Sequence, residues 1–281
     1  MKKVQVKIPA KINLTLDVID KKKGYHEIKS LVAPIDIYDE ITIKRRTDWD
    51  ITLVDKGIKV DCEPCDNNAF KAAKLFSDTF ITEGVDIQVN KNIPIGAGLG
   101  GSSADIAGVL TAMKKLFEVD KDVKPLADEL GSDSGYMLTS GWAIISGKGE
   151  KVEYKKVDKK LYLILITEQK QVLAKDSYKK FDALKKSPKP CTEKTYKALM
   201  ESDVQKFNSS AKNDLYEASK VLVPQIEFNV NVLKKAGAPL AIMTGSGSTV
   251  VGVFTDKKER DAVYKKLALL YGEQILLAQT L

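Results

Sequence analysis

The sequence predicts an α+β protein built from two domains. Stretches of alternating apolar and polar residues indicate strands, and stretches with apolar residues three and four apart indicate helices. Some strands follow one another closely and others are separated by helices, a mixture typical of α+β proteins rather than of an alternating parallel sheet. With 281 residues, of which 43% are apolar, the chain has the length for two domains of ordinary size.

Two short strands are expected at the start of the chain. Apolar residues alternate with polar ones over 4–8 and again over 12–18, which is the period of a half-buried strand. Pro9-Ala10 separates the two stretches, so a bend or bulge is expected there. The other face of the second strand carries Lys11, Asn13, Thr15 and Asp17.

The rest of the first half continues these periodicities. A helix is expected after Asn68, because its alanines and phenylalanines share one face. A shorter helix is expected to end near Gly131, ahead of a strand at 142–146. The other strands expected in this half are 41–45, 50–54 and 85–89.

A glycine-rich stretch, 94–105, leads into another expected helix, which has one apolar face beginning at Ile106. Ser102 or Ser103 is its expected N-cap. Asp105 is expected in the first turn, where negative charge suits the helix dipole.

The charged segment Lys151–Lys160 is the expected join, which places the domains at 1–155 and 156–281. An apolar strand at 161–166 opens the second domain. The helices expected after it are 174–184, 192–201, 225–236 and 256–270. The remaining expected strands are 240–244, 249–254 and 274–279.

The composition favours a cytoplasmic protein with neither a nucleic-acid nor a membrane partner. The net charge of +7 is a small excess of 45 basic over 38 acidic residues. Short clusters such as Lys21-Lys22-Lys23 and Lys185-Lys186 lack the interleaved aromatic residues of a nucleic-acid surface. No apolar stretch approaches the ~20 residues that span a bilayer, and the chain begins without an apolar signal-peptide core.

The three cysteines do not predict a metal or redox site. Cys62 and Cys65 form a C-x-x-C pair, but a structural zinc needs four ligands, whereas Cys191 is distant and His26 is the only histidine. A redox pair would open a helix after a buried strand, and this pair lies among polar loop residues. An incidental loop pair is the expectation.

The stretch 94–105 predicts a phosphate site. Its four glycines allow positive φ and close approach of the backbone to a ligand. The helix that follows offers unpaired N–H groups and the positive end of its dipole, which together bind anions.

Three common phosphate motifs do not fit this stretch. Gly96-x-Gly98-x-x-Gly101 satisfies the dinucleotide-binding expression, but no buried strand runs into Gly96 and none follows the helix. The chain contains no Walker A sequence, and it contains neither H-R-D nor D-F-G of the protein kinases.

The form P-x-G-x-G-L-G-G-S-S-A instead resembles the phosphate loop of the GHMP kinases, a superfamily that includes galactokinase, homoserine kinase and mevalonate kinase. Three further segments resemble it in the expected order: Pro9–Leu14, Gly131–Asp133 and Met243–Thr249. The resemblance implies a two-domain GHMP-kinase fold. Its N-terminal mixed α/β domain would have ribosomal-protein-S5-like topology, its C-terminal domain would be an α/β plait, and the substrate site would lie at the cleft between them.

The resemblance also implies the residues of a kinase site. Lys11 and Asp133 match the reacting centre, where a carboxylate orients the attacking hydroxyl and a lysine neutralises charge on the phosphoryl group. ATP and Mg²⁺ are the implied cofactors, and no magnesium ligand is assigned. The resemblance leaves open whether Ser103 contacts magnesium or a phosphate. The implied ATP-binding residues are Pro94, Gly96, Ala97, Gly98, Leu99, Gly100, Gly101, Ser102 and Ser103.

Within the superfamily, Gly24-Tyr25-His26 and Ala10–Leu14 most resemble the kinases that phosphorylate a hydroxyl of a diphosphocytidyl sugar alcohol in the non-mevalonate route to isoprenoids. Tyr25 and His26 match contacts to cytosine, by stacking and by hydrogen bonding. The implied substrate-binding residues are Asn13, Tyr25, His26, Lys91 and Tyr178. The partners implied are this small molecule and ATP, with the protein a monomer or homodimer.

Two positions depart from that group. Asp133-Ser134-Gly135-Tyr136 stands where the group has Asp-Val-Pro-Phe, and Lys23 stands where an acidic residue is usual. Two other functions therefore stay open. One is a GHMP kinase for another small alcohol, similar to mevalonate or homoserine. The other is a catalytically silent nucleotide-binding paralogue.

Overall fold

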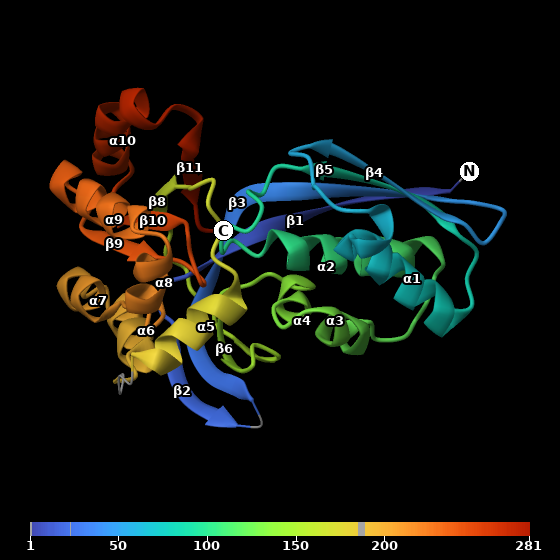
Figure 1. The fold of residues 1–281 in the computed structure, drawn as a ribbon, viewed down its shortest axis with the longest axis horizontal. Helices are drawn as coiled ribbons and strands as arrows, with labels where there is room; N and C mark the ends of the chain where they lie inside the picture. The colour runs from blue at the N-terminus through green and yellow to red at the C-terminus, as the bar shows by residue number, and fades with distance from the viewer. Residues whose placement is uncertain (1, 23, 185–188) are drawn as a thin grey trace. The chain divides into compact units, whose positions relative to one another are not determined.

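The structure, a computed structural model, describes residues 2–22, 24–184 and 189–281 (Figure 1). Lys23 and the Lys185-Lys186 pair lie outside the described residues. Two compact units are present, and both are discontinuous in sequence. Unit 1 comprises Met1–Ala10, Ile37–Ile95 and Gly100–Ser140, and unit 2 comprises Lys11–Asp36, Gly96–Leu99 and Gly141–Leu281.

The units do not coincide with the expected single boundary after residue 155. Strands β1 (Lys3–Asn13) and β3 (Tyr25–Arg45) each contribute residues to both units. A strand as long as β3 has room for different partners along its length, so the chain returns to it several times.

In unit 1, β3 pairs with β5 (Val85–Lys91), and β5 pairs with β4 (Ile51–Gly57). The β3–β5 ladder is antiparallel and the β4–β5 ladder is parallel. In β5, Val85, Ile87 and Val89 are buried and alternate with half-buried polar residues. This alternation is the signature of a strand with one face on the core.

Helices cover one face of this sheet (Figure 1). Helix α1 (Asn68–Phe80) follows the short 3₁₀ turn η1 (Pro64–Asp66) and begins where the Asn67 side chain accepts a hydrogen bond from the Ala69 N–H. It packs against α2 (Gly101–Leu116). The remaining helices of the unit are α3 (Lys124–Leu130) and α4 (Ser134–Met137).

Gly108 lets α2 lie close against the sheet. A β-carbon at this position would lie 2.5 Å from Cδ1 of Ile41 and 3.1 Å from Cγ1 of Ile8. Glycine costs a helix interior about 0.5–1 kcal/mol relative to alanine. The close contact between α2, β1 and β3 offsets that cost, and it fixes the position of the helix that the glycine loop precedes.

In unit 2, β3 pairs with β2 (Asp17–Lys22) and with β6 (Ala143–Gly147), which pairs with β7 (Lys151–Tyr154). The segment expected to be a join between domains thus contains strand β7. A second sheet has the order β11-β8-β10-β9 and is antiparallel throughout. Its strands are β8 (Tyr162–Ile166), β9 (Leu240–Met243), β10 (Val250–Phe254) and β11 (Ile275–Gln279).

Helices α9 (Gln225–Ala236) and α10 (Lys257–Tyr271) pack on this second sheet, and the short turn η2 (Gly272–Gln274) leads from α10 into β11. Helices α5 (Ala174–Ala183) and α6 (Thr192–Met200) were expected from their periodicity. Helices α7 (Val204–Ser210) and α8 (Tyr216–Leu222) were not. No helix in the described part of the chain is long and apolar enough to cross a membrane.

The expected break at Pro9-Ala10 is wrong. Strand β1 continues through both residues, and the interruption comes between Asn13 and Asp17, where β2 begins. Strand β1 pairs only with β3 among the described strands. A strand with one partner has an edge at which the missing N–H of proline costs no ladder hydrogen bond.

Candidate active site

The glycine loop enters α2 through residues with left-handed backbone. Gly96, Gly98 and Gly100 have φ of 63°, 75° and 77°. Gly100, rather than Ser102 or Ser103, is the N-cap, so both serines lie in the first turn. The N–H groups of a first turn have no partner within the helix, so they remain available to an anion.

Gly98 lies against a second glycine turn, Gly245-Ser246-Gly247, within unit 2. A β-carbon on Gly98 would lie 2.5 Å from the carbonyl oxygen of Thr244, and one on Gly245 would lie 2.9 Å from the carbonyl oxygen of Gly98. Neither position therefore has room for a side chain. The motif at 243–249 therefore packs against the backbone of the glycine loop and supports it.

Asn213 supports this second turn. Its Nδ2 donates to the carbonyl oxygens of Met243, at 2.9 Å, and Gly245, at 2.8 Å. Asn213 was not among the residues expected at the site. Thr244 adds a link, because its Oγ1 accepts a hydrogen bond of 2.8 Å from the backbone N–H of Asn13.

Lys11 lies buried at the end of β1, with 5% of its surface exposed. Its Nζ donates to Oδ1 of Asn13 at 2.6 Å, and Asn13 Nδ2 donates to Ser30 Oγ at 2.7 Å. Its backbone N–H donates to the carbonyl of Leu99 in the glycine loop at 3.0 Å. A buried ammonium within such a network is held in place, which suits a charge-stabilising role.

Asp133 is the N-cap of α4 in unit 1. The residues that replace the usual Val-Pro-Phe form this helix and are buried, Tyr136 among them. The preceding turn packs against the first turn of α2, because a β-carbon on Gly131 would lie 3.6 Å from Ser103 Oγ. Asp133 and Ser103 thus belong to neighbouring parts of one unit, whereas Ser102 bonds to Asn68 of α1.

Lys91 lies beneath the start of α2 and is 3% exposed. Its Nζ lies 2.6 Å from Asp39 Oδ2 and 2.6 Å from Asp105 Oδ2, and it donates to the Gly101 carbonyl at 3.2 Å. Asp39 also accepts from the backbone N–H groups of Asn92 and Ile93. These bonds tie the end of β5 to α2.

The buried ions of this cluster perturb one another. Burial, more than the opposing attraction of Lys91, raises the pKa of Asp105 to about 7. Burial lowers the pKa of Lys91, but the two carboxylates outweigh it and leave that pKa above its ordinary value. The expected placement of Asp105 in the first turn is wrong, because α2 begins at Gly101 and Asp105 lies beyond that turn, with its side chain facing Lys91 inside the unit.

Tyr25, His26 and Tyr178 all belong to unit 2. The rings of His26 and Tyr178 stack with centroids 4.6 Å apart and planes 16° apart. The Nε2 atom of His26 lies 2.7 Å from Asp182 Oδ1. Tyr25 is 59% exposed, and the Nζ of Lys148 lies 3.8 Å from its ring centroid. The exposed Tyr25 ring and the fixed His26 imidazole, neighbours in the chain, are side chains of the kinds that bind a planar base.

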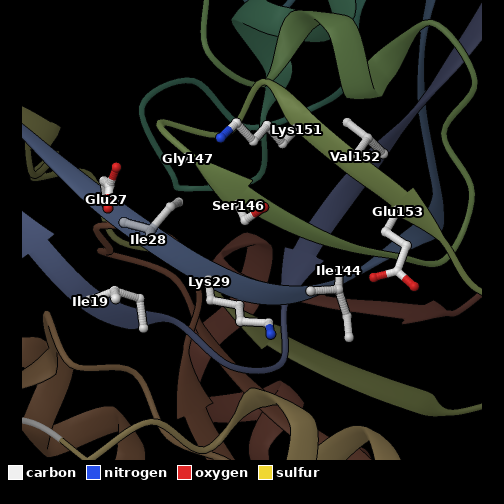
Figure 2. Close-up of a pocket in the computed structure, with 10 residues that line it drawn as sticks. All are labelled: Ile19, Glu27, Ile28, Lys29, Ile144, Ser146, Gly147, Lys151, Val152 and Glu153. Carbon is white, nitrogen blue, oxygen red and sulfur yellow. The ribbon is translucent and has the colours of Figure 1, made fainter.

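A separate cavity of about 390 Å³ opens on β2, β3, β6 and β7 (Figure 2). Its lining mixes apolar residues such as Ile28 and Ile144 with charged ones such as Lys29 and Glu153. It contains none of the expected site residues, although Glu27 and Gly147 are the chain neighbours of His26 and Lys148. No group of three or more His, Cys, Asp or Glu residues that could hold a metal exists among the described residues.

Comparisons with known proteins identify the family. The model for the GHMP kinases N terminal domain matches residues 67–146, and that for GHMP kinases C terminal matches 195–272. The chain belongs to the GHMP kinase family. A curated relative, 4-diphosphocytidyl-2-C-methyl-D-erythritol kinase of Clostridium beijerinckii, is 34% identical over 96% of this chain and 98% of its own.

Solved structures confirm the two-domain, mixed α/β fold. A crystal structure of 4-(cytidine 5'-diphospho)-2C-methyl-D-erythritol kinase is similar with a TM-score of 0.83 and 25% identity, covering 98% of both chains. The mevalonate kinase of L. major has a TM-score of 0.73 at 16% identity, covering 99% of this chain and 95% of that one, a likeness of fold alone.

Proposed function

We propose that this chain is an ATP-dependent kinase that phosphorylates a hydroxyl of 4-diphosphocytidyl-2-C-methyl-D-erythritol, a step of isoprenoid precursor synthesis. The observation that carries the proposal is the 34% identity to kinases of that name, because it extends over nearly the whole chain. The stacked His26–Tyr178 pair and the exposed ring of Tyr25, the chain neighbour of His26, support a base-binding acceptor site.

The glycine loop would hold the phosphates of ATP. The family's kinases use ATP, and the residues from Pro94 to Ser103 form a positive-φ loop followed by a helix start. Backbone N–H groups at such a start bind phosphate without a charged side chain. Lys91 would act through that helix start rather than touch the acceptor, because its Nζ is bound to Asp39 and Asp105.

Lys11 and Asp133 would serve the transfer itself. The Asp133 carboxylate would accept a hydrogen bond from the attacking hydroxyl and orient it toward the phosphorus. The Lys11 ammonium would offset charge on the transferred phosphoryl group. Asn13, which binds Lys11 Nζ, would keep that ammonium from other positions.

Ser103 would contribute to a magnesium site. Magnesium in kinases is bound largely by phosphate oxygens and water, with few protein ligands. Ser103 suits such an ion because it lies in the first turn of α2 with its Oγ beside the Gly131 turn. When bound, the ion would neutralise phosphate charge.

A test compares acceptors with purified protein. ADP release is measured with ATP and Mg²⁺ and, in turn, 4-diphosphocytidyl-2-C-methyl-D-erythritol, mevalonate, homoserine or no acceptor. We expect acceptor-dependent release with the first compound only. Release with mevalonate or homoserine instead would assign the chain to another alcohol, and no release with any acceptor would favour a silent paralogue.

A further inference from the structure

The ring of His26 is held by three residues of α5. Tyr178 covers one of its faces, Phe181 meets its edge at a centroid distance of 6.3 Å, and Asp182 binds Nε2. The side chain of His26 is 9% exposed. Because one helix supplies all three contacts, the orientation of the imidazole is fixed as well as its position.

Asp182 is itself held by Lys21. The Nζ of Lys21 donates to Asp182 Oδ2 at 2.5 Å, while Oδ1 faces His26. Lys21 is also directly opposite His26 in the β2–β3 ladder. Two hydrogen bonds lower the pKa of Asp182 below its ordinary value: the larger effect comes from Lys21 and the smaller from His26.

These contacts decide which ring nitrogen carries the proton. An ionised carboxylate only accepts hydrogen bonds, so His26 Nε2 must be the donor to Asp182. In a neutral imidazole the other nitrogen, Nδ1, is then an acceptor. Within residues 2–22, 24–184 and 189–281, no protein group hydrogen-bonds to Nδ1.

We propose that Asp182 is a positioning residue that fixes His26 as the Nε2–H tautomer and so makes the site select an amino-bearing pyrimidine. This inference rests on the proposed function, since it concerns the base of that acceptor. Cytosine carries an amino group that donates to Nδ1, whereas uracil carries a carbonyl in the same place. Two acceptors facing each other leave both without a partner, which disfavours uracil.

The substitution Asp182→Asn tests this directly. Lys21 attracts the amide oxygen, so the amide nitrogen turns to His26 and donates to Nε2. The proton of the neutral ring then moves to Nδ1, which becomes a donor. We expect cytidine diphosphate to bind about 10- to 100-fold more weakly, and the preference over uridine diphosphate to shrink or reverse.

Binding is measured by calorimetry with a non-hydrolysable ATP analogue saturating the nucleotide site, so that only the acceptor site is read. Asp176→Asn, which makes the same change elsewhere on α5, is the matched control and should keep the wild-type preference. In turnover, Asp182→Asn should raise KM for the acceptor and leave kcat nearly unchanged.

The tautomer is visible separately, because His26 is the only histidine of the chain. A ¹⁵N spectrum of labelled imidazole should show one ring, protonated at Nε2 in wild type and at Nδ1 in Asp182→Asn. A wild-type ring protonated at Nδ1, or an unchanged base preference in Asp182→Asn, would overturn the inference. Correct tautomers and base preference without phosphorylation would instead reject the proposed function alone.

Discussion

A β-carbon on Gly98 would lie 2.5 Å from the carbonyl oxygen of Thr244, so the glycine loop and the second glycine turn pack backbone against backbone. This contact joins two motifs that are far apart in sequence and belong to the same unit. The second motif therefore acts first as a support for the loop, and ligand contacts are an addition to that role.

Gly98→Ala should weaken ATP binding and lower thermal stability. Alanine at φ of 75° costs about 1–3 kcal/mol in strain, and the clash with Thr244 adds to it. Gly272→Ala is the control, because Gly272 has φ of 52° and open space around it. Melting temperatures and ATP affinities measure both effects. If the two variants lose stability and ATP affinity equally, the Gly98–Thr244 contact does not support the loop.

Asn213→Ala should also weaken ATP binding. The change leaves the carbonyl oxygens of Met243 and Gly245 without their side-chain donor, at about 1–3 kcal/mol for each buried group that stays unsatisfied. Asn208→Ala on α7 is the comparison. If both variants bind ATP as the wild type does, the second turn does not depend on Asn213.

Lys91→Met should destabilise the protein by about 3–5 kcal/mol, because it leaves two buried carboxylates without their cation. Lys44→Met, which changes an exposed lysine on β3 of the same sheet, should change the unfolding free energy little. Denaturant unfolding measures both. If Lys91→Met is as stable as the wild type but has a raised KM for the acceptor, this prediction is contradicted and Lys91 binds the acceptor.

The Asp105 carboxyl predicts a pH dependence. Its folded pKa of about 7 exceeds the ordinary value, so the folded state holds its proton more tightly than the unfolded chain. Its contribution to stability is fully present below the ordinary pKa of an aspartate, and it is lost as the pH rises from there to about 7. Asp105→Asn should flatten this part of the unfolding free-energy curve, and an unchanged slope would contradict it.

Asp133→Asn should lower turnover about 10²- to 10⁴-fold, because an amide cannot accept the hydroxyl proton. ATP affinity should stay near the wild-type value, since the glycine loop is not altered. Wild-type turnover in this variant would remove Asp133 from the reacting centre.

Much of the fold was accessible from periodicity. The helices 68–80 and 225–236 and the strands of the second sheet follow their apolar spacing closely. The continuity of strand β1 was harder to predict. Pro9 predicts a break in the strand, but a strand that pairs on one side only tolerates a proline on its free edge. Short helices such as α7 bury few residues and leave little periodic signal.

The site was predictable only where it lies in motifs. The glycine loop, Lys11 and Asp133 are recognisable in sequence, but Asp39 and Asp182 are single acids without a pattern around them. Their roles arise from partners 52 and 156 residues away, Lys91 and His26. Lys91 was expected at the acceptor from its match to the family, and its burial between Asp39 and Asp105 became visible only in the structure.

The most direct test of the account is mass spectrometry of 4-diphosphocytidyl-2-C-methyl-D-erythritol incubated with ATP, Mg²⁺ and the protein. We expect the compound to gain one phosphoryl group for each ATP converted to ADP, and Asp133→Asn to slow that gain about 10²- to 10⁴-fold. An unmodified acceptor after full incubation with the wild-type protein would contradict the proposed function.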